Sequence, residues 1–232
     1  AVAAMQHRLG LDRPIWAQYA TFMSHSLRGD FGTSMVTGRP ILQDVRAVLP
    51  HTLILTIAAM IVGTLMGVPA GVFAALYRNR WIDVLVRMVS LLGLSFPVFV
   101  SGVFALLAFA LHWPLFPVIG NANLDDPLAV LDKLVLPAAT LGIIMAAYIT
   151  RVTRSSMLQV LSEDYMRTAR AKGVPWRLVV WRHGLRNAGL PVVTVVGLYV
   201  GILIGNSLLT EIVFHRPGLG KIIVSALDQR DY

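Results

Sequence analysis

Residues 217–221 read Pro-Gly-Leu-Gly-Lys and come nearest in this chain to a phosphate-binding loop. A Walker A loop needs a glycine five positions before its second glycine and a Ser or Thr after the lysine, because its backbone and hydroxyl hold the phosphates and Mg²⁺. Those two positions hold His215 and Ile222. The sequence therefore predicts that any ATP driving this protein is bound, with its Mg²⁺, by another chain.

Other motifs that carry chemistry are also missing from the sequence. The histidines do not have the spacing of metal ligands, and the chain contains no cysteine. Neither a Gly-x-Ser-x-Gly elbow nor a His-Glu-x-x-His helix occurs. We predict that this chain is not an enzyme, and that it carries no catalytic residue, metal site or cofactor. The six histidines are His7, His25, His51, His112, His183 and His215.

Residues 163–186 have the composition of a docking element. Small residues would let a partner surface approach closely, and basic residues would make charge contacts. Gly173 and Pro175 would end one short helix and begin another segment. The residues alone also allow a solvated basic loop held by anionic lipid. The candidate docking residues are Tyr165, Arg167, Thr168, Ala169, Arg170, Ala171, Lys172 and Gly173.

Glu211 stands at the end of a long apolar run that also contains Asn206. A carboxylate beside the membrane core is costly unless it is paired or hydrated, so it is a candidate functional residue. We place Glu211 and Asn206 on a possible translocation path. An interfacial residue that reaches water or caps a loop is the competing interpretation.

The composition predicts an all-α, polytopic membrane protein that positions these residues. The chain is 56% hydrophobic and 14% charged, whereas soluble domains average about 25% charged residues. Four apolar runs are long enough to cross a bilayer, with Pro97 as a kink in the second. The third is the shortest and is expected to continue as helix past Arg151. The four predicted spans are residues 53–76, 88–111, 134–150 and 189–210.

Basic residues predict the orientation of these spans. Residues 77–87 contain three Lys or Arg and residues 151–187 contain eight, whereas residues 112–133 contain only Lys133. The positive-inside rule therefore places 77–87 and 151–187 in the cytoplasm. The same rule accounts for the net charge of +8, so this charge does not indicate nucleic-acid binding. We predict an extracytoplasmic segment over residues 1–50, with an amphipathic helix after Pro14, and a transmembrane domain over residues 51–232.

Glycines recur at four-residue spacing in two of the spans. Such a series lines one face of a helix and lets another backbone approach closely, although glycine is common in membrane helices generally. We predict two helix-packing faces. They consist of Gly63, Gly67 and Gly71, and of Gly197, Gly201 and Gly205.

Several stretches, in order, resemble the permeases of ATP-binding-cassette (ABC) importers for dipeptides, oligopeptides and nickel. The clearest is Thr-Ala-Arg-Ala-Lys-Gly at 168–173, which resembles the coupling loop of that family. Arg167-Thr168-Ala169 replaces the Glu-Ala-Ala of importers in general, as is usual in the peptide branch. The other matching stretches are residues 9–14, 29–34, 182–187, 190–191, 211–214 and 217–220.

This resemblance implies a subunit of the bacterial cytoplasmic (inner) membrane, the B-type permease of a pair. Its partners would be a second homologous permease, two ABC ATPases, an extracytoplasmic solute-binding protein, membrane lipid and a peptide substrate. Six spans are usual, so the chain would lack the first and the last. Nickel or another small solute is the alternative cargo. A secondary transporter or channel, and a membrane-embedded enzyme, are the alternative classes of protein.

Overall fold

The computed structural model describes residues 14–116 and 127–231, which are helical apart from turns and one isolated bridge between Thr33 and Pro40. The predicted all-α membrane fold is confirmed. Three helices in this part of the chain are long and apolar enough to cross a membrane, or four if one bent pair forms a single span. Of the described residues, 14–49 with 222–231 form one compact unit, and 50–116 with 127–221 form the other.

The smaller unit contains α2 (Ile15–Leu27), which begins directly after Pro14, where the sequence predicts a helix. It also contains the first residues of α3 (Ile41–Leu76) and most of α10 (Leu219–Gln229). Asp231 ties the loop before α3 to the end of the chain by accepting hydrogen bonds from Ser34 Oγ (2.5 Å) and Met35 N (2.7 Å). These bonds lower the pKa of the Asp231 carboxyl, that from Ser34 most strongly.

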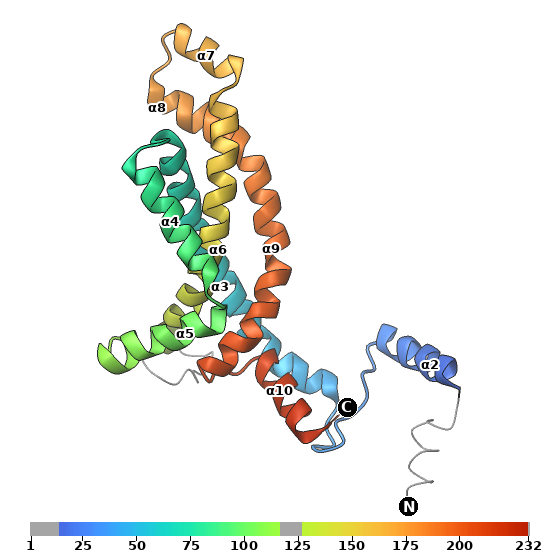
Figure 1. The fold of residues 1–232 in the computed structure, drawn as a ribbon. Coiled ribbons are helices and arrows are strands. Elements are labelled where there is room, and N and C mark those ends of the chain that lie inside the picture. The colour runs from blue at the N-terminus through green and yellow to red at the C-terminus, as the bar shows by residue number, and fades with distance from the viewer. Residues whose placement is uncertain (1–13, 117–126, 232) are drawn as a thin grey trace, which may run out of the picture. The chain divides into compact units, whose positions relative to one another are not determined.

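The larger unit is a helical bundle in which α6 (Pro127–Leu161) occupies the centre (Figure 1). It packs against α4 (Trp81–Ser95) and α9 (Arg186–Val213), and against the glycine face of α3. Apolar side chains from α3, α6 and α9 meet in the main core, which stabilises the bundle through close packing. Its most deeply buried members are Leu55, Ala59, Leu141, Met145, Ile149 and Leu203.

The second predicted span is broken at Pro97. The chain forms α4, then α5 (Val98–Leu106) and the π-helix η1 (Leu107–His112), with a bend of 99° between the two parts. Proline has no N–H to donate and disfavours helical backbone in the residue before it. Phe96 accordingly adopts an extended conformation (φ −102°, ψ 137°). The sequence predicted a kink within 88–111, whereas the helix begins at Trp81 and the bend divides it in two.

The remaining spans extend beyond their predicted limits. α3 begins at Ile41, α6 continues to Leu161 as expected, and α9 covers Arg186–Val213. The short helix α8 (Trp176–Leu178) and the π-helix η2 (Val179–Leu185) lead directly into α9. The apolar runs in the sequence mark only the most apolar part of each helix, because helix continues where polar residues replace apolar ones.

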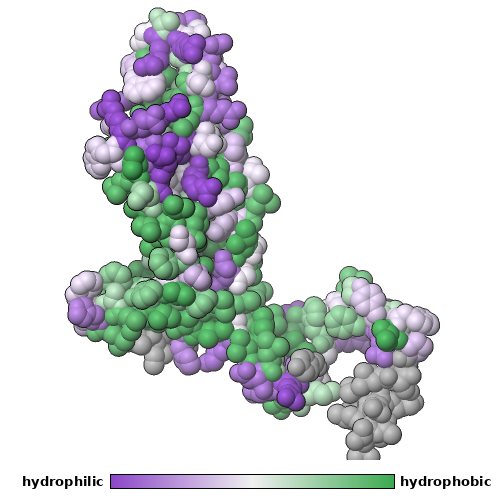
Figure 2. All heavy atoms as spheres, in the orientation of Figure 1, coloured by the Kyte–Doolittle hydropathy of each residue, from purple (hydrophilic) through white to green (hydrophobic). Residues whose placement is uncertain are grey.

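Hydrophilic and hydrophobic residues separate along the larger unit (Figure 2). Hydrophilic side chains gather over α7 (Asp164–Ala171), over α8, and over the adjoining parts of α4 and α6. Hydrophobic side chains cover the parts of α4 and α5 further from α7. This is the distribution expected when one end of a bundle leaves the hydrocarbon layer.

Candidate functional site

The candidate docking residues form the short helix α7 and its C-terminal turn. Ser162 and Glu163 separate α7 from α6, and Gly173 ends it with a φ of +82°. Gly173 N donates to Arg170 O (3.0 Å) and Val174 N donates to Ala169 O (3.2 Å), which satisfies the last carbonyls of the helix. A Cβ at position 173 would meet no atom within 4 Å, so glycine is favoured there by its backbone conformation rather than by lack of space.

One side of α7 is anchored to the body of the protein. Met166 is buried, and its methyl lies with that of Met157 around Gly184 of η2. The Tyr165 hydroxyl accepts a hydrogen bond from Asn187 Nδ2 (2.9 Å) at the start of α9. These contacts fix the helix against η2 and α9.

The other side of α7 is exposed. Arg167, Thr168, Arg170, Ala171 and Lys172 are all accessible, and Ala169 is half-buried. The guanidinium of Arg170 lies 4.2 Å from the centre of the Trp176 ring, a cation–π contact that orients it. Asp164 in the first turn and Arg170 in the last match the helix dipole. The structure thus presents small and basic residues together on one free surface.

Glu211 is buried near the C-terminal end of α9, whereas α7 contacts Asn187 at the start of that helix. Oε1 accepts a hydrogen bond from Thr52 Oγ1 (2.6 Å) and Oε2 accepts one from Gly220 N (2.8 Å). Thr52 Oγ1 also accepts from Leu219 N (3.0 Å). This Glu211 clamp therefore joins α3, α9 and the first residues of α10.

The turn between α9 and α10 packs tightly around the clamp. A Cβ at Gly218 would collide with the Glu211 carboxylate, which explains the glycine there. Arg216 is also buried and donates from Nη1 to the Lys133 carbonyl (2.8 Å). Burial lowers the pKa of the Arg216 guanidinium, and the charge of Glu211 acts in the opposite direction. Asn206, the other residue predicted on the translocation path, lies before Glu211 on α9 and is half-buried.

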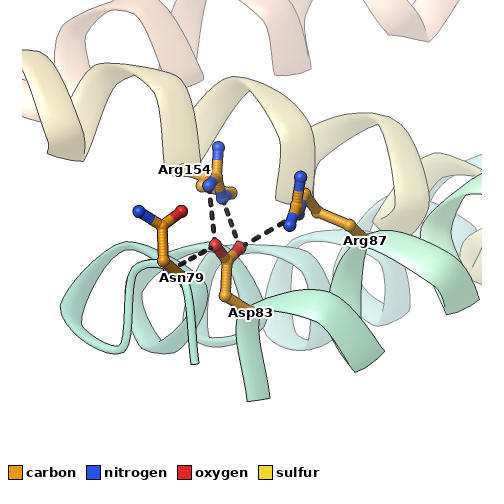
Figure 3. A network of polar contacts seen from close by, with 4 residues as sticks. All are labelled: Asn79, Asp83, Arg87 and Arg154. Atoms are coloured by element: carbon orange, nitrogen blue, oxygen red, sulfur yellow. Dashed lines mark hydrogen bonds and ion pairs between the residues drawn. The ribbon is translucent and has the colours of Figure 1, made fainter. Parts of the chain in front are cut away.

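A second polar cluster, which the motif search missed, joins α4 to α6 (Figure 3). Asp83 accepts a bidentate pair of hydrogen bonds from Arg154, at 2.6 Å from Nε and 2.8 Å from Nη2. Arg87 Nε lies 3.4 Å from the same carboxylate, and Asn79 N donates to it at 3.0 Å. The sequence does contain an indication of this cluster, because Asp83 is a charged residue among apolar ones. Read from the sequence, Arg87 and Arg154 indicate only membrane orientation.

The two glycine series differ in their surroundings. A Cβ at Gly63, Gly67 or Gly71 would lie 2.5–2.9 Å from atoms of α6. Cβ atoms at Gly197, Gly201 and Gly205 would meet nothing within 4 Å among the described residues. The structure therefore brings the first series into close helix contact and leaves the second open.

The bundle, with an anchored basic helix exposed outside its candidate spans, defines a multi-pass helical membrane protein. Comparison with known families identifies that class further. Residues 67–232 match the model of the binding-protein-dependent transport system inner membrane component. The chain belongs to this family, which makes it a permease subunit of an ABC importer in the inner membrane.

Curated relatives support the same assignment over the whole chain. The glutathione transport system permease protein GsiC of Salmonella typhimurium is 44% identical, and that of Escherichia coli K12 is 42% identical. Each match covers 100% of this chain and 73% of the relative. A solved structure described as an amino acid ABC transporter with histidines has the same fold, with a TM-score of 0.58 and 17% identity over 82% of this chain and 81% of its own.

Family membership settles several predictions. The predicted importer permease is confirmed, and the secondary-transporter and channel alternatives are set aside. The permease subunit is not catalytic, and permeases of this family bind no cofactor. A binding-protein-dependent system implies ATPase subunits, a partner permease and a solute-binding protein.

Proposed function

We propose that this subunit carries short peptides across the inner membrane and that α7 is its coupling helix. The observation that carries the proposal is the arrangement of α7, which has one side anchored through Met166 and the other exposing small and basic residues. An ATPase groove could seat on the exposed side. Movement of the ATPase would then pass through the anchored side into η2 and α9.

The cargo part of the proposal is supported by the relatives. Permeases named for glutathione, a tripeptide, are 42–44% identical to this chain. Uptake of labelled dipeptides, glutathione and longer peptides into cells that carry the complete transporter tests the cargo. Uptake of one peptide class that depends on this subunit is the expected result. Uptake of Ni²⁺ without any peptide would contradict it.

The proposed path role rests more on Asn206 than on Glu211. The Glu211 carboxylate is held by Thr52 and Gly220, which supports a positioning role for this residue at the end of α9. Asn206 remains half-accessible and could meet cargo directly. We expect Asn206→Ala to change the apparent KM for peptide, whereas Glu211→Gln should mainly lower the amount of folded subunit.

The coupling role is tested with Gly173→Leu in the full-length subunit, assembled with its partners. Strain at a left-handed backbone position costs about 1–3 kcal/mol and should loosen the end of α7. We expect peptide uptake to fall about tenfold, within the range of coupling effects of single mutations. Membrane insertion should persist.

Two variants separate docking from general strain. Gly29 has a similar φ of +79° and equally open surroundings but lies far from α7 in sequence, so Gly29→Leu is the matched control. Gly173→Asn tests the backbone directly, because asparagine tolerates this conformation. Normal uptake by Gly173→Leu, or an equal loss in Gly29→Leu, would contradict the coupling role.

A further inference from the structure

A basic pocket of about 660 Å³ opens between α4 and α6, and neither the coupling helix nor the Glu211 clamp includes it. Arg87 and Leu91 line it from α4. Tyr148, Arg151, Arg154 and Ser155 line it from α6. Its α6 residues lie in the last part of that helix, which ends at Leu161 shortly before α7. The positive-inside rule places this end of the bundle toward the cytoplasm.

The charges around this basic pocket do not cancel. Its wall carries three arginines, Arg87, Arg151 and Arg154. One carboxylate, that of Asp83, contacts two of them and is fully buried behind them. Three positive charges against one negative charge leave a net charge of +2 facing the opening. The hydroxyls of Tyr148 and Ser155 add hydrogen-bonding groups beside this charge.

The lining changes from basic to apolar with distance from α7. On α4, Leu91 lies one turn beyond Arg87 and is 64% exposed. On α6, the ring of Tyr148 lies one turn before Arg151 and Val152. The outward residues of α4 beside the pocket, Met88 and Leu92, are also exposed and apolar. A ligand that fits this gradient has an anionic group at one end and a hydrocarbon chain at the other.

We propose that the basic pocket binds the phosphate of an acidic phospholipid from the cytoplasmic leaflet. Arg151 and the free donors of Arg87 and Arg154 hold the phosphodiester, and the acyl chains lie along Leu91 and the outer face of α4. Basic pockets between spans on the cytoplasmic side are suited to such headgroups because the inner leaflet is anionic. Arginine suits the role because its fixed fork binds phosphate oxygens in pairs. Asp83 orients Arg154 and so acts as a positioning residue.

The test uses the full-length subunit assembled with its partner permease and ATPases. The complex is placed in nanodiscs of phosphatidylcholine with roughly one quarter phosphatidylglycerol. The complex is then released from the nanodisc, and native mass spectrometry identifies the lipid that stays bound to it. Wild type should retain phosphatidylglycerol in preference to phosphatidylcholine. Arg87→Gln combined with Arg151→Gln should lower this retention about 10- to 30-fold, since each basic residue near an anionic surface contributes about fivefold.

The control removes the same charge elsewhere on the predicted cytoplasmic side. Arg78 and Arg182 are exposed and lie outside the pocket, so Arg78→Gln combined with Arg182→Gln should retain lipid like wild type. Equal loss in both double variants would overturn the proposal, because it would reduce the effect to general surface charge. If the pocket double variant does not assemble, Arg151→Gln alone, which leaves the Asp83 cluster intact, must still show a fivefold loss or the proposal fails.

Two further measurements distinguish the source of the anion. Inorganic phosphate added in excess should not displace the bound phosphorus, which should extract into organic solvent as lipid. Displacement would assign the site to free phosphate and contradict the proposal. Uptake of acidic and neutral peptides is then compared in phosphatidylcholine membranes alone. A loss restricted to acidic peptides in the pocket variant would assign the pocket to cargo and overturn the lipid assignment.

Discussion

The glycine face of α3 and the glycine face of α9 have the same spacing in sequence and opposite surroundings in the structure. On α3, Gly67 lies so close to α6 that a Cβ would come within 2.8 Å of the Ala146 carbonyl oxygen. On α9, a Cβ at Gly201 would meet no described residue within 4 Å. The spacing of small residues therefore indicates that a helix face can be approached closely. It does not indicate whether the approaching helix belongs to the same bundle.

The largest expected effect comes from filling the α3 face. In Gly71→Leu the Cβ alone would lie 2.5 Å from Thr153 Cβ and 2.7 Å from the Thr150 carbonyl oxygen. Overpacking against backbone cannot be relieved by a rotamer change, so we expect a loss of about 3 kcal/mol or more. Thermal unfolding of the detergent-solubilised subunit, followed by circular dichroism, measures it. A wild-type midpoint would show that the two helices are less tightly packed than described.

A somewhat smaller loss is expected when α6 is released from α4. Asp83→Asn would leave Arg154 without its carboxylate, although that arginine keeps 21% of its side chain exposed and can reach water. We therefore expect a loss of about 2–3 kcal/mol, below the usual cost of breaking a fully buried pair. The same unfolding measurement applies. Exchanging the two residues, Asp83→Arg with Arg154→Asp, should restore part of the loss if the pair itself stabilises the bundle.

The two faces of α9 can be compared directly. Leu203 is buried in the core, whereas Leu198 is 72% exposed. We expect Leu203→Ala to cost about 2 kcal/mol through the cavity it creates, and Leu198→Ala to stay within about 0.5 kcal/mol of wild type. The unfolding midpoints of Leu203→Ala and Leu198→Ala, measured under the same conditions, test this difference. Equal losses would mean that the exposed face of α9 is packed in the isolated subunit.

The smallest effect is expected at the open glycine face. Gly201→Leu should change the stability of the isolated subunit by less than about 0.5 kcal/mol, in contrast to the same change at Gly71. The variant is then assembled with its partner permease and ATPases and compared with wild type by size-exclusion chromatography. If Gly201→Leu lowered the stability of the isolated subunit by several kcal/mol, the glycine faces of α3 and α9 would not differ as we infer.

The sequence predicts correctly those features that depend on local composition and backbone geometry. The apolar runs identified the spans because a bilayer core demands some 20 apolar residues, and Gly173 with Pro175 marked the end of α7 through backbone geometry. Long-range partners could not be found this way. Nothing near Asp83 in sequence indicates Arg154, and Glu211 gives no sign that Thr52 and Gly220 will bind its carboxylate. The 99° bend at Pro97 also exceeds what one proline implies.

The anchoring of α7 has a mechanical consequence. The helix is joined to α6 by a turn of two residues, and it is held to η2 and the start of α9 by Met166 and Tyr165. With two attachments on different helices, α7 cannot roll freely about its own axis. A force applied to its exposed face is therefore shared as a load between α6 and α9, which should tilt together. The hydrogen bonding of the π-helical turn at η2 is less regular than that of an α-helix. We therefore expect η2 to be the part of this connection that deforms most easily.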